Sequence, residues 1–116
     1  MLNKEDIRFK RKGRKIMVRH VVSWNYKDEI ESDKKQKLNM FFKNAFLDLK
    51  EKVPGVLNIE VGAPPLDSSS KELCLYVEMT DEHILLTYRD HPDHVAIAEI
   101  IKDNCKDRCC VDFLGN

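Results

Sequence analysis

The segment IMVRHVVSWNY, residues 16–26, decides the fold. Apolar side chains occupy five of its six even positions, from Ile16 through Val22 to Tyr26, whereas its odd positions are mixed. A period of two is typical of a β-strand with one covered face, so a strand is expected here. His20 lies on the even face. The pattern therefore places an imidazole on the side of the strand that faces the interior.

A helix and two more strands are expected after this segment. Ser32 is predicted as the N-cap of a helix that runs to about Lys52, with an apolar stripe that includes Phe42. Pro54-Gly55 ends that helix and turns the chain. Residues 56–61 and 73–79 alternate between apolar and other side chains, which predicts two strands joined by a loop rich in Pro and Ser.

The last third of the chain predicts a short helix over residues 80–90, a helix from Pro92 to about Asn104, and a strand over residues 108–114. Proline is tolerated in the first turn of a helix, where its missing N–H costs nothing. The order βαββαβ is the ferredoxin-like arrangement. We therefore expect an α+β fold in which helices cover one face of a four-stranded antiparallel sheet.

The other face of that sheet is too apolar to lie wholly in water. It carries Met17, Val21, Val56, Cys74 and Tyr76. Apolar surface of this kind marks an interaction site, and closed two-fold symmetry is the commonest way to cover it. A homodimer that packs sheet against sheet is the natural inference.

Length and composition describe a single soluble domain. The chain has 116 residues, of which 42% are hydrophobic and 34% charged. The sequence shows neither a membrane-spanning run nor a signal-peptide pattern. Its four cysteines are therefore expected to be reduced thiols in the cytoplasm rather than disulfides.

Residues 1–15 differ from the rest, because they hold seven Lys or Arg and two acidic residues. A basic tail can contact nucleic acid, but its low apolar content favours a disordered leader, and the remaining body is acidic. We therefore expect no nucleic-acid partner and no membrane partner. Residues 16–114 are predicted to form the domain, and Met17 is an alternative start of the natural protein.

The segment YRDHPDHV, residues 88–95, carries the candidate chemistry. His91 is expected at or near the N-cap of the helix that Pro92 opens. His94 shares the inward stripe of that helix, where the positive end of the helix dipole favours a neutral ring. His94 is thus a candidate base, and Tyr88 is a candidate hydrogen-bond donor to a developing oxyanion.

Together these pieces resemble the stress-responsive A/B barrel (Dabb) domain family of dimeric α+β barrel proteins. The resemblance rests on residues 18–24, Val53-Pro54-Gly55-Val56, Glu60-Val61-Gly62, the Tyr88 to Val95 element and Val111-Asp112-Phe113. It implies a homodimer whose two sheets form a barrel, with a small-molecule pocket between sheet and helices. Where members of the family cyclise polyketides, the residues matching His94 and Tyr88 form the acid–base pair, and the residue matching His20 lines the cavity.

Three readings of function follow. The first is a protein that binds a small organic molecule through His20, Val22, Trp24, Phe42 and His91, without assigned chemistry. The second is a cyclase or lyase that uses His94 and Tyr88 on a carbonyl-rich substrate. The third is a purely structural dimer whose pocket is filled, for instance by Trp24 and Phe42. Neither a metal nor an organic cofactor is expected, because His91 and His94 diverge around a helix and the cysteines lack zinc-ligand spacing.

Overall fold

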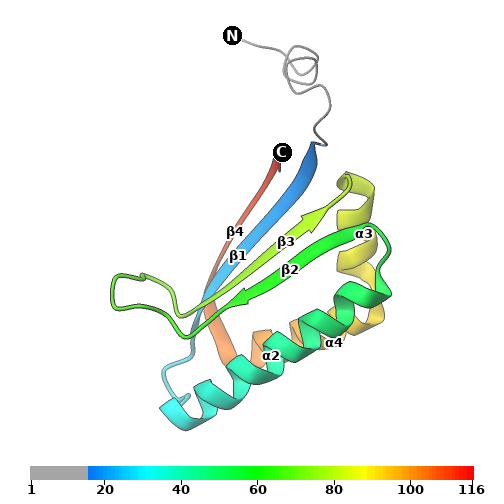
Figure 1. Cartoon of the computed structure of the whole chain (residues 1–116). Coiled ribbons are helices and arrows are strands. Elements are labelled where there is room, and N and C mark those ends of the chain that lie inside the picture. The colour runs from blue at the N-terminus through cyan, green and yellow to red at the C-terminus, as the bar shows by residue number, and fades with distance from the viewer. Residues whose placement is uncertain (1–15) are drawn as a thin grey trace.

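The computed structural model describes residues 16–116. In chain order its elements are β1 (Met17–Tyr26), α2 (Ser32–Lys52), β2 (Val56–Gly62), β3 (Leu73–Met79), α3 (Glu82–Asp90), α4 (Pro92–Asn104) and β4 (Cys105–Gly115). The four strands form one antiparallel sheet in the order β2-β3-β1-β4 (Figure 1). This arrangement confirms the predicted ferredoxin-like fold. The basic segment 1–15 and its predicted disorder lie outside the described residues.

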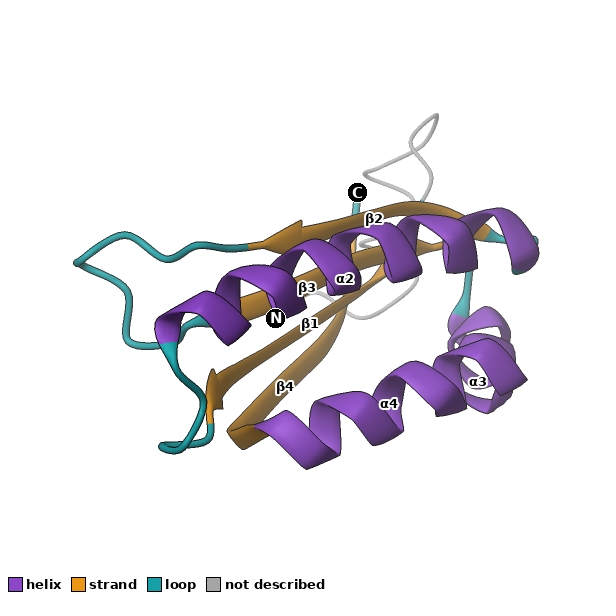
Figure 2. Ribbon diagram, turned by 90° about the horizontal axis from the view of Figure 1, so that it is seen from below, coloured by secondary structure: helices purple, strands orange, loops and turns teal. Residues whose placement is uncertain are grey.

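Within residues 16–116, helices cover one face of the sheet and leave the other without helices. Figure 2 shows α2 lying along β2 and β3, while α4 lies on the same side and runs beside β4. Along β1 the burial alternates strictly, and the even residues from Val18 to Tyr26 are buried beneath the helices. The odd residues of β1, starting with Met17, lie on the side without helices, which we call the open face.

The long helix α2 buries Phe42, Phe46 and Leu49, as its stripe predicts. Its start differs by one residue from the prediction: Glu31 occupies the N-cap position, and the Glu31 side chain makes no capping hydrogen bond. Glu31 has extended backbone angles, so Ser32 already belongs to the first turn. The second apolar face of this helix, which includes Met40 and Leu47, is exposed in the single chain.

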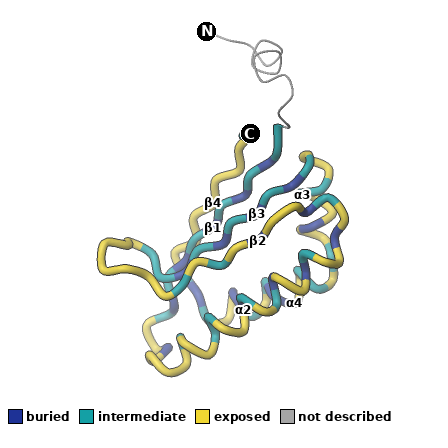
Figure 3. Tube along the Cα trace, viewed as in Figure 1, coloured by how far each residue is buried: buried dark blue, intermediate teal, exposed yellow. Residues whose placement is uncertain are grey.

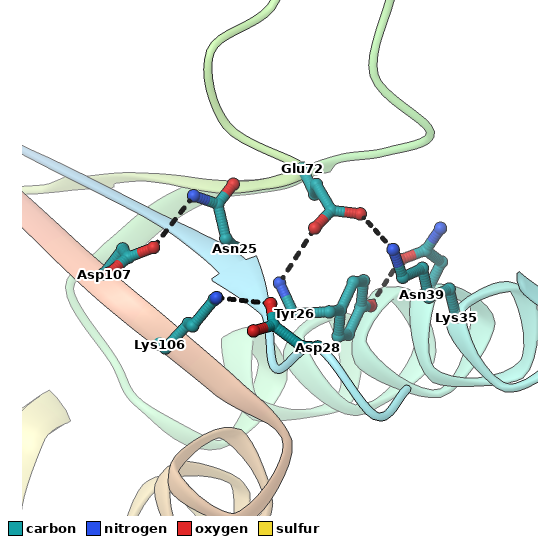
Figure 4. A network of polar contacts seen from close by, with 8 residues as sticks. All are labelled: Asn25, Tyr26, Asp28, Lys35, Asn39, Glu72, Lys106 and Asp107. Carbon is teal, nitrogen blue, oxygen red and sulfur yellow. Dashed lines mark hydrogen bonds and ion pairs between the residues drawn. The ribbon is translucent and has the colours of Figure 1, made fainter. Parts of the chain in front are cut away.

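A polar network holds α2 to one end of the sheet (Figure 4). The Tyr26 hydroxyl donates to Oδ1 of Asn39 on α2 at 2.5 Å. Glu72 accepts from the Tyr26 backbone N–H at 3.2 Å and from Lys35 Nζ at 2.7 Å. These bonds join β1, the segment before β3 and the first turns of α2. They connect α2 to the sheet at the end of β1 where Tyr26 lies.

Two short caps position α3 and α4. Asp81 Oδ1 accepts the N–H of Ile84 at 3.1 Å and so begins α3. His91 ends α3 and begins α4: its ring Nδ1 accepts the N–H of Asp93 at 3.0 Å, and Pro92 takes the first helical position. The sequence prediction of a helix start at His91-Pro92 is confirmed.

The last strand is longer than expected. It was predicted over residues 108–114 but runs from Cys105 to Gly115, directly after α4. Cys105 pairs with Tyr26 and is buried, and a register shift between Ser23 and Asn25 lets the strand continue along β1. β4 forms an edge of the sheet, and most of it is exposed (Figure 3). Its register places Asp112 opposite His20 and Cys110 opposite Val22, on the helix-covered face.

Candidate functional site

Three separate elements bring His20, Tyr88 and His94 together. His20 lies in the middle of β1, Tyr88 in the last turn of α3 and His94 in the first turn of α4. The ring centroids of Tyr88 and His94 are 4.5 Å apart, and those of Tyr88 and His20 are 6.0 Å apart in an edge-on contact. All three line a cavity of about 300 Å³ beside β4, which we call the imidazole pocket.

The tautomer of His94 follows from its hydrogen bond. Its Nδ1 lies 3.0 Å from the backbone carbonyl oxygen of Arg89. A carbonyl oxygen only accepts, so Nδ1 carries the hydrogen and Nε2 of the neutral ring holds the lone pair. Burial lowers the pKa of His94, although the Arg89 carbonyl opposes this by favouring the protonated ring. Near neutral pH the ring is therefore a neutral base.

Tyr88 is the most unusual polar group of the site. The residue is 1% exposed, and its hydroxyl is the one buried side-chain oxygen or nitrogen within residues 16–116 that has no hydrogen-bond partner. Burial raises the pKa of this phenol well above its ordinary value, so the hydroxyl keeps its proton. Buried polar groups nearly always have partners, and an unpaired one calls for an explanation. Tyr88 also lines the imidazole pocket, so this unpaired donor belongs to the wall of the site.

His20 is held by a residue that sequence reasoning did not single out as functional. Its Nδ1 lies 2.5 Å from Oδ1 of Asp112 on β4. The carboxylate accepts from Nδ1, so the lone pair of the neutral imidazole is on Nε2. The sequence does contain a feature that points to Asp112, because it is a charged residue between the apolar residues Val111 and Phe113 in a strand. Only the register of β4 against β1 shows that it faces His20.

A second cavity of about 330 Å³ adjoins the first, and His20, His94 and Arg108 line both. We call it the apolar pocket, because its walls are mainly hydrophobic. Val22 and Trp24 of β1 belong to these walls, together with Phe46, Leu75, Ala98 and Ile101. Trp24 thus lines the pocket and leaves space beside it. The two pockets form a polar end and an apolar end of one site.

Two of the predicted ligand-binding residues do not border either pocket. Phe42 is fully buried and packs edge-on against Phe41, with ring centroids 5.6 Å apart. His91 uses its Nδ1 to cap α4. Ligand binding by either residue therefore stays a prediction.

One group of possible metal ligands occurs in the part of the chain that the structure describes. It consists of His20, Cys110 and Asp112, whose ligand atoms all lie within 4.8 Å of one another. Sequence reasoning considered His20, His91 and His94 together with a cysteine, and it expected no metal. It missed the group of three because Cys110 and Asp112 meet His20 only through strand pairing. Burial and the nearby Asp112 carboxylate raise the pKa of the Cys110 thiol, so this cysteine is not an activated nucleophile.

Comparison with known proteins identifies relatives of this arrangement. The family model described as "Stress responsive A/B Barrel Domain" matches residues 18–114. A dimeric protein of unknown function with a ferredoxin-like fold from Bacteroides fragilis is 30% identical, with a TM-score of 0.77 over 84% of this chain and 94% of that one. No curated protein matches the sequence.

Two more distant solved structures share the fold. A dimeric ferredoxin-like protein of unknown function from Thermobifida fusca is 24% identical, with a TM-score of 0.71 over 86% of this chain and 92% of that one. A hydroxynitrile lyase from Passiflora edulis is 13% identical, with a TM-score of 0.69 over 89% of this chain and 96% of that one. At these identities the likeness is one of fold.

Proposed function

Because the chain belongs to the stress-responsive A/B barrel domain family, we propose that it binds a small organic carbonyl compound between its sheet and helices. The observation that carries this proposal is the unpaired Tyr88 hydroxyl beside the imidazole pocket. A carbonyl oxygen is the acceptor that this buried donor lacks. Sites for small molecules combine apolar walls with a few converging polar groups, as here.

The two ends of the site suit the two ends of such a compound. Tyr88 offers a proton donor, and Nε2 of His94 offers a lone pair, so an oxygen-bearing group is recognised at the polar end. The walls near Trp24 and Phe46 suit an aromatic or aliphatic remainder. Ordinary organic molecules of this kind gain binding free energy mainly from the apolar area that they bury.

Trp24 is the single tryptophan of the chain and lines the apolar pocket, so its fluorescence reports on occupancy. We suggest titration with 2,4-dihydroxyacetophenone, a small aromatic ketone, checked by calorimetry. Tyr88→Phe removes one hydrogen bond and should raise the dissociation constant roughly three- to tenfold. Tyr26→Phe is the matched control, because the Tyr26 hydroxyl donates to Asn39 and Tyr26 borders neither pocket. Equal affinity in both variants would argue against the proposal.

A homodimer is part of the proposed function. The open face exposes apolar side chains of β4, with Val111 58% exposed and Phe113 45% exposed. In the register of the sheet Val111 lies opposite Val21 of β1, which continues the apolar surface. The relatives from Bacteroides fragilis and Thermobifida fusca are described as dimeric. We infer that two copies pack their open faces together.

An enzymatic role is the second candidate, and the state of His94 favours it. Its neutral Nε2 can take a proton from the carbon next to a carbonyl, while Tyr88 donates a hydrogen bond to the carbonyl oxygen. The resulting enolate can form a carbon–carbon bond with a second carbonyl of the same molecule. The new alkoxide then receives the proton back from His94. This sequence describes a cyclase, and its reverse describes a lyase.

Deuterium exchange at the methyl group of the same ketone, followed by NMR in D₂O, tests the first proton transfer. The wild type should accelerate exchange, and His94→Asn should reduce the rate of the accelerated exchange by about 10²–10⁴-fold. Asparagine keeps a donor for the Arg89 carbonyl and lacks the lone pair of Nε2, so the fold should persist. Exchange at the same rate in wild type and His94→Asn would exclude this enzyme reading.

The cellular location of the protein is also a proposal. No helix within residues 16–116 is long and apolar enough to cross a membrane. Within those residues Cys74, Cys105, Cys109 and Cys110 are free thiols. We propose a cytoplasmic location, where thiols stay reduced. A role in stress is suggested by the family's description alone.

A further inference from the structure

We propose that His20, Cys110 and Asp112 form a three-ligand site for a transition-metal cation, with Zn²⁺ the best match. We call these residues the edge cluster, because Cys110 and Asp112 belong to the edge strand β4 and pair with the centre of β1. The proposal goes beyond organic-molecule binding and does not rest on it. It requires neither Tyr88 nor an occupied pocket.

The separations between the donor atoms are close to those around a tetrahedral metal. The Cys110 sulfur lies 3.8 Å from His20 Nδ1 and 3.7 Å from Asp112 Oδ2. Zinc bonds of about 2.0–2.3 Å at tetrahedral angles hold neighbouring N, O and S ligand atoms about 3.3–3.6 Å apart. A single cation between the three side chains is therefore within reach of all of them with small rotations.

The pair His20 and Asp112 must open for the metal to enter, since Nδ1 and Oδ1 now lie 2.5 Å apart. The Asp112 side chain is 41% exposed on an edge strand, so it has room to rotate. In the bound state the metal replaces the hydrogen on Nδ1, which moves through solvent to Nε2. The Cys110 thiol loses its proton to solvent, so one proton is released for each cation bound.

Donor type and charge select the kind of cation. One imidazole nitrogen, one thiolate and one carboxylate form a mixed set that suits Zn²⁺ and excludes the oxygen-seeking Mg²⁺ and Ca²⁺. The thiolate and carboxylate together neutralise a divalent ion. This matters because Arg108 also lines the imidazole pocket and would repel a complex with net positive charge. Cysteines 109 and 110 are adjacent but lie on opposite faces of β4, so only Cys110 faces the site.

Three protein ligands leave a fourth tetrahedral position free. Sites of this kind bind water or a ligand atom in that position, whereas purely structural zinc sites use four protein ligands. The edge cluster borders the imidazole pocket, where His94 is also found. The free position of the metal would therefore be shared with the molecule or water that occupies this pocket.

Cobalt(II) is the probe for the test, because a thiolate bound to Co²⁺ gives a charge-transfer absorption that oxygen and nitrogen ligands do not. We expect the full chain to bind one Co²⁺ per protomer with this absorption, and Zn²⁺ to abolish it by displacement. Cys110→Ser should eliminate the absorption, and Asp112→Asn should raise the dissociation constant roughly tenfold or more. Cys109→Ser is the matched control and should behave as the wild type.

Alkylation supplies a second readout that does not depend on a variant. Zn²⁺ should protect Cys110 from iodoacetamide, measured by mass spectrometry of peptides, and the extent of Cys109 alkylation should be the same with and without Zn²⁺. Absence of the thiolate absorption in the wild type overturns the proposal. So does retention of that absorption in Cys110→Ser, or equal alkylation of Cys110 with and without Zn²⁺. None of these results bears on ketone binding, which Trp24 fluorescence follows separately.

Discussion

The ring of Tyr88 lies 4.5 Å from the ring of His94, centroid to centroid and inclined by 55°, although the two residues belong to different helices. The sharp junction at His91-Pro92, which ends α3 and begins α4, produces this contact. The same junction turns the Arg89 carbonyl toward Nδ1 of His94. A phenol with a free proton and an imidazole with a free lone pair therefore share one pocket wall.

The unpaired Tyr88 hydroxyl predicts an unusual effect on stability. Removing a buried hydroxyl that has no partner also removes its desolvation cost, so Tyr88→Phe should leave the free energy of unfolding unchanged or raise it by about 1 kcal/mol. Tyr26→Phe is the comparison, because the Tyr26 hydroxyl donates to Asn39. That variant should lose about 1 kcal/mol. Urea unfolding of both proteins measures the difference, and a clear loss in Tyr88→Phe would mean that its hydroxyl is already paired.

Stability should fall on the acid side because of His94. Burial holds the pKa of His94 in the folded protein below the ordinary 6.5 of the unfolded chain. The unfolded chain therefore binds more protons as the pH drops through the unfolded value. Above the unfolded pKa this contribution to the free energy of unfolding is fully present. It decreases as the pH falls below that value, and the decrease ends once the pH is below the lower pKa of the folded protein. The slope from one such group is at most about 1.4 kcal/mol per pH unit.

His94→Asn isolates this contribution. Urea unfolding measures the free energy of unfolding at about pH 7.5 and at about pH 5.5. The difference between these two values is compared between the wild type and the variant. The variant should lose less stability on acidification, because it lacks the His94 imidazole and is otherwise the same chain. An identical pH dependence in the two proteins would show that His94 is not buried as a neutral ring.

Sequence reasoning reached the fold and the main pocket residues because those features are periodic or local. The alternation of side chains along residues 16–26 predicts β1. The conformational limits of proline predict that α4 begins at Pro92. His20 and His94 were expected on inward faces, and the structure brings both to one pocket. These inferences needed only the period of an element and the conformational limits of one residue.

The features that sequence reasoning missed depend on long-range register. Cys110 and Asp112 are separated from His20 by about ninety residues, and only the pairing of β4 with β1 brings them together. The start of β4 at Cys105 depends on the register shift between Ser23 and Asn25 of β1, which composition does not predict. In the same way, the stripe of α2 identifies Phe42 as buried but does not say that it faces the core rather than a pocket.

His91 can be tested as a capping residue. His91→Ala removes the acceptor for the Asp93 N–H and should cost about 1 kcal/mol of stability. His91→Asp should restore most of that loss, because a carboxylate is a good N-cap and favours the positive end of the helix dipole. Urea unfolding of the three proteins checks this. Failure of Asp to restore stability would contradict the capping role, and loss of ketone binding in the stable Asp variant would support the predicted ligand role.

The proposed dimer makes the last prediction. Two-fold symmetry brings each open face against its own copy, so Val111→Lys introduces two lysines into one interface. Burying these charges without partners is costly, and the dissociation constant of the dimer should rise roughly 100-fold or more. Leu47→Lys is the control: Leu47 is 53% exposed on α2, on the helical side of the sheet. Size-exclusion chromatography with light scattering should find Val111→Lys monomeric at concentrations where Leu47→Lys and the wild type are dimers. If Leu47→Lys is monomeric and Val111→Lys is a dimer, the interface lies on the outer surface of α2 and not on the open face.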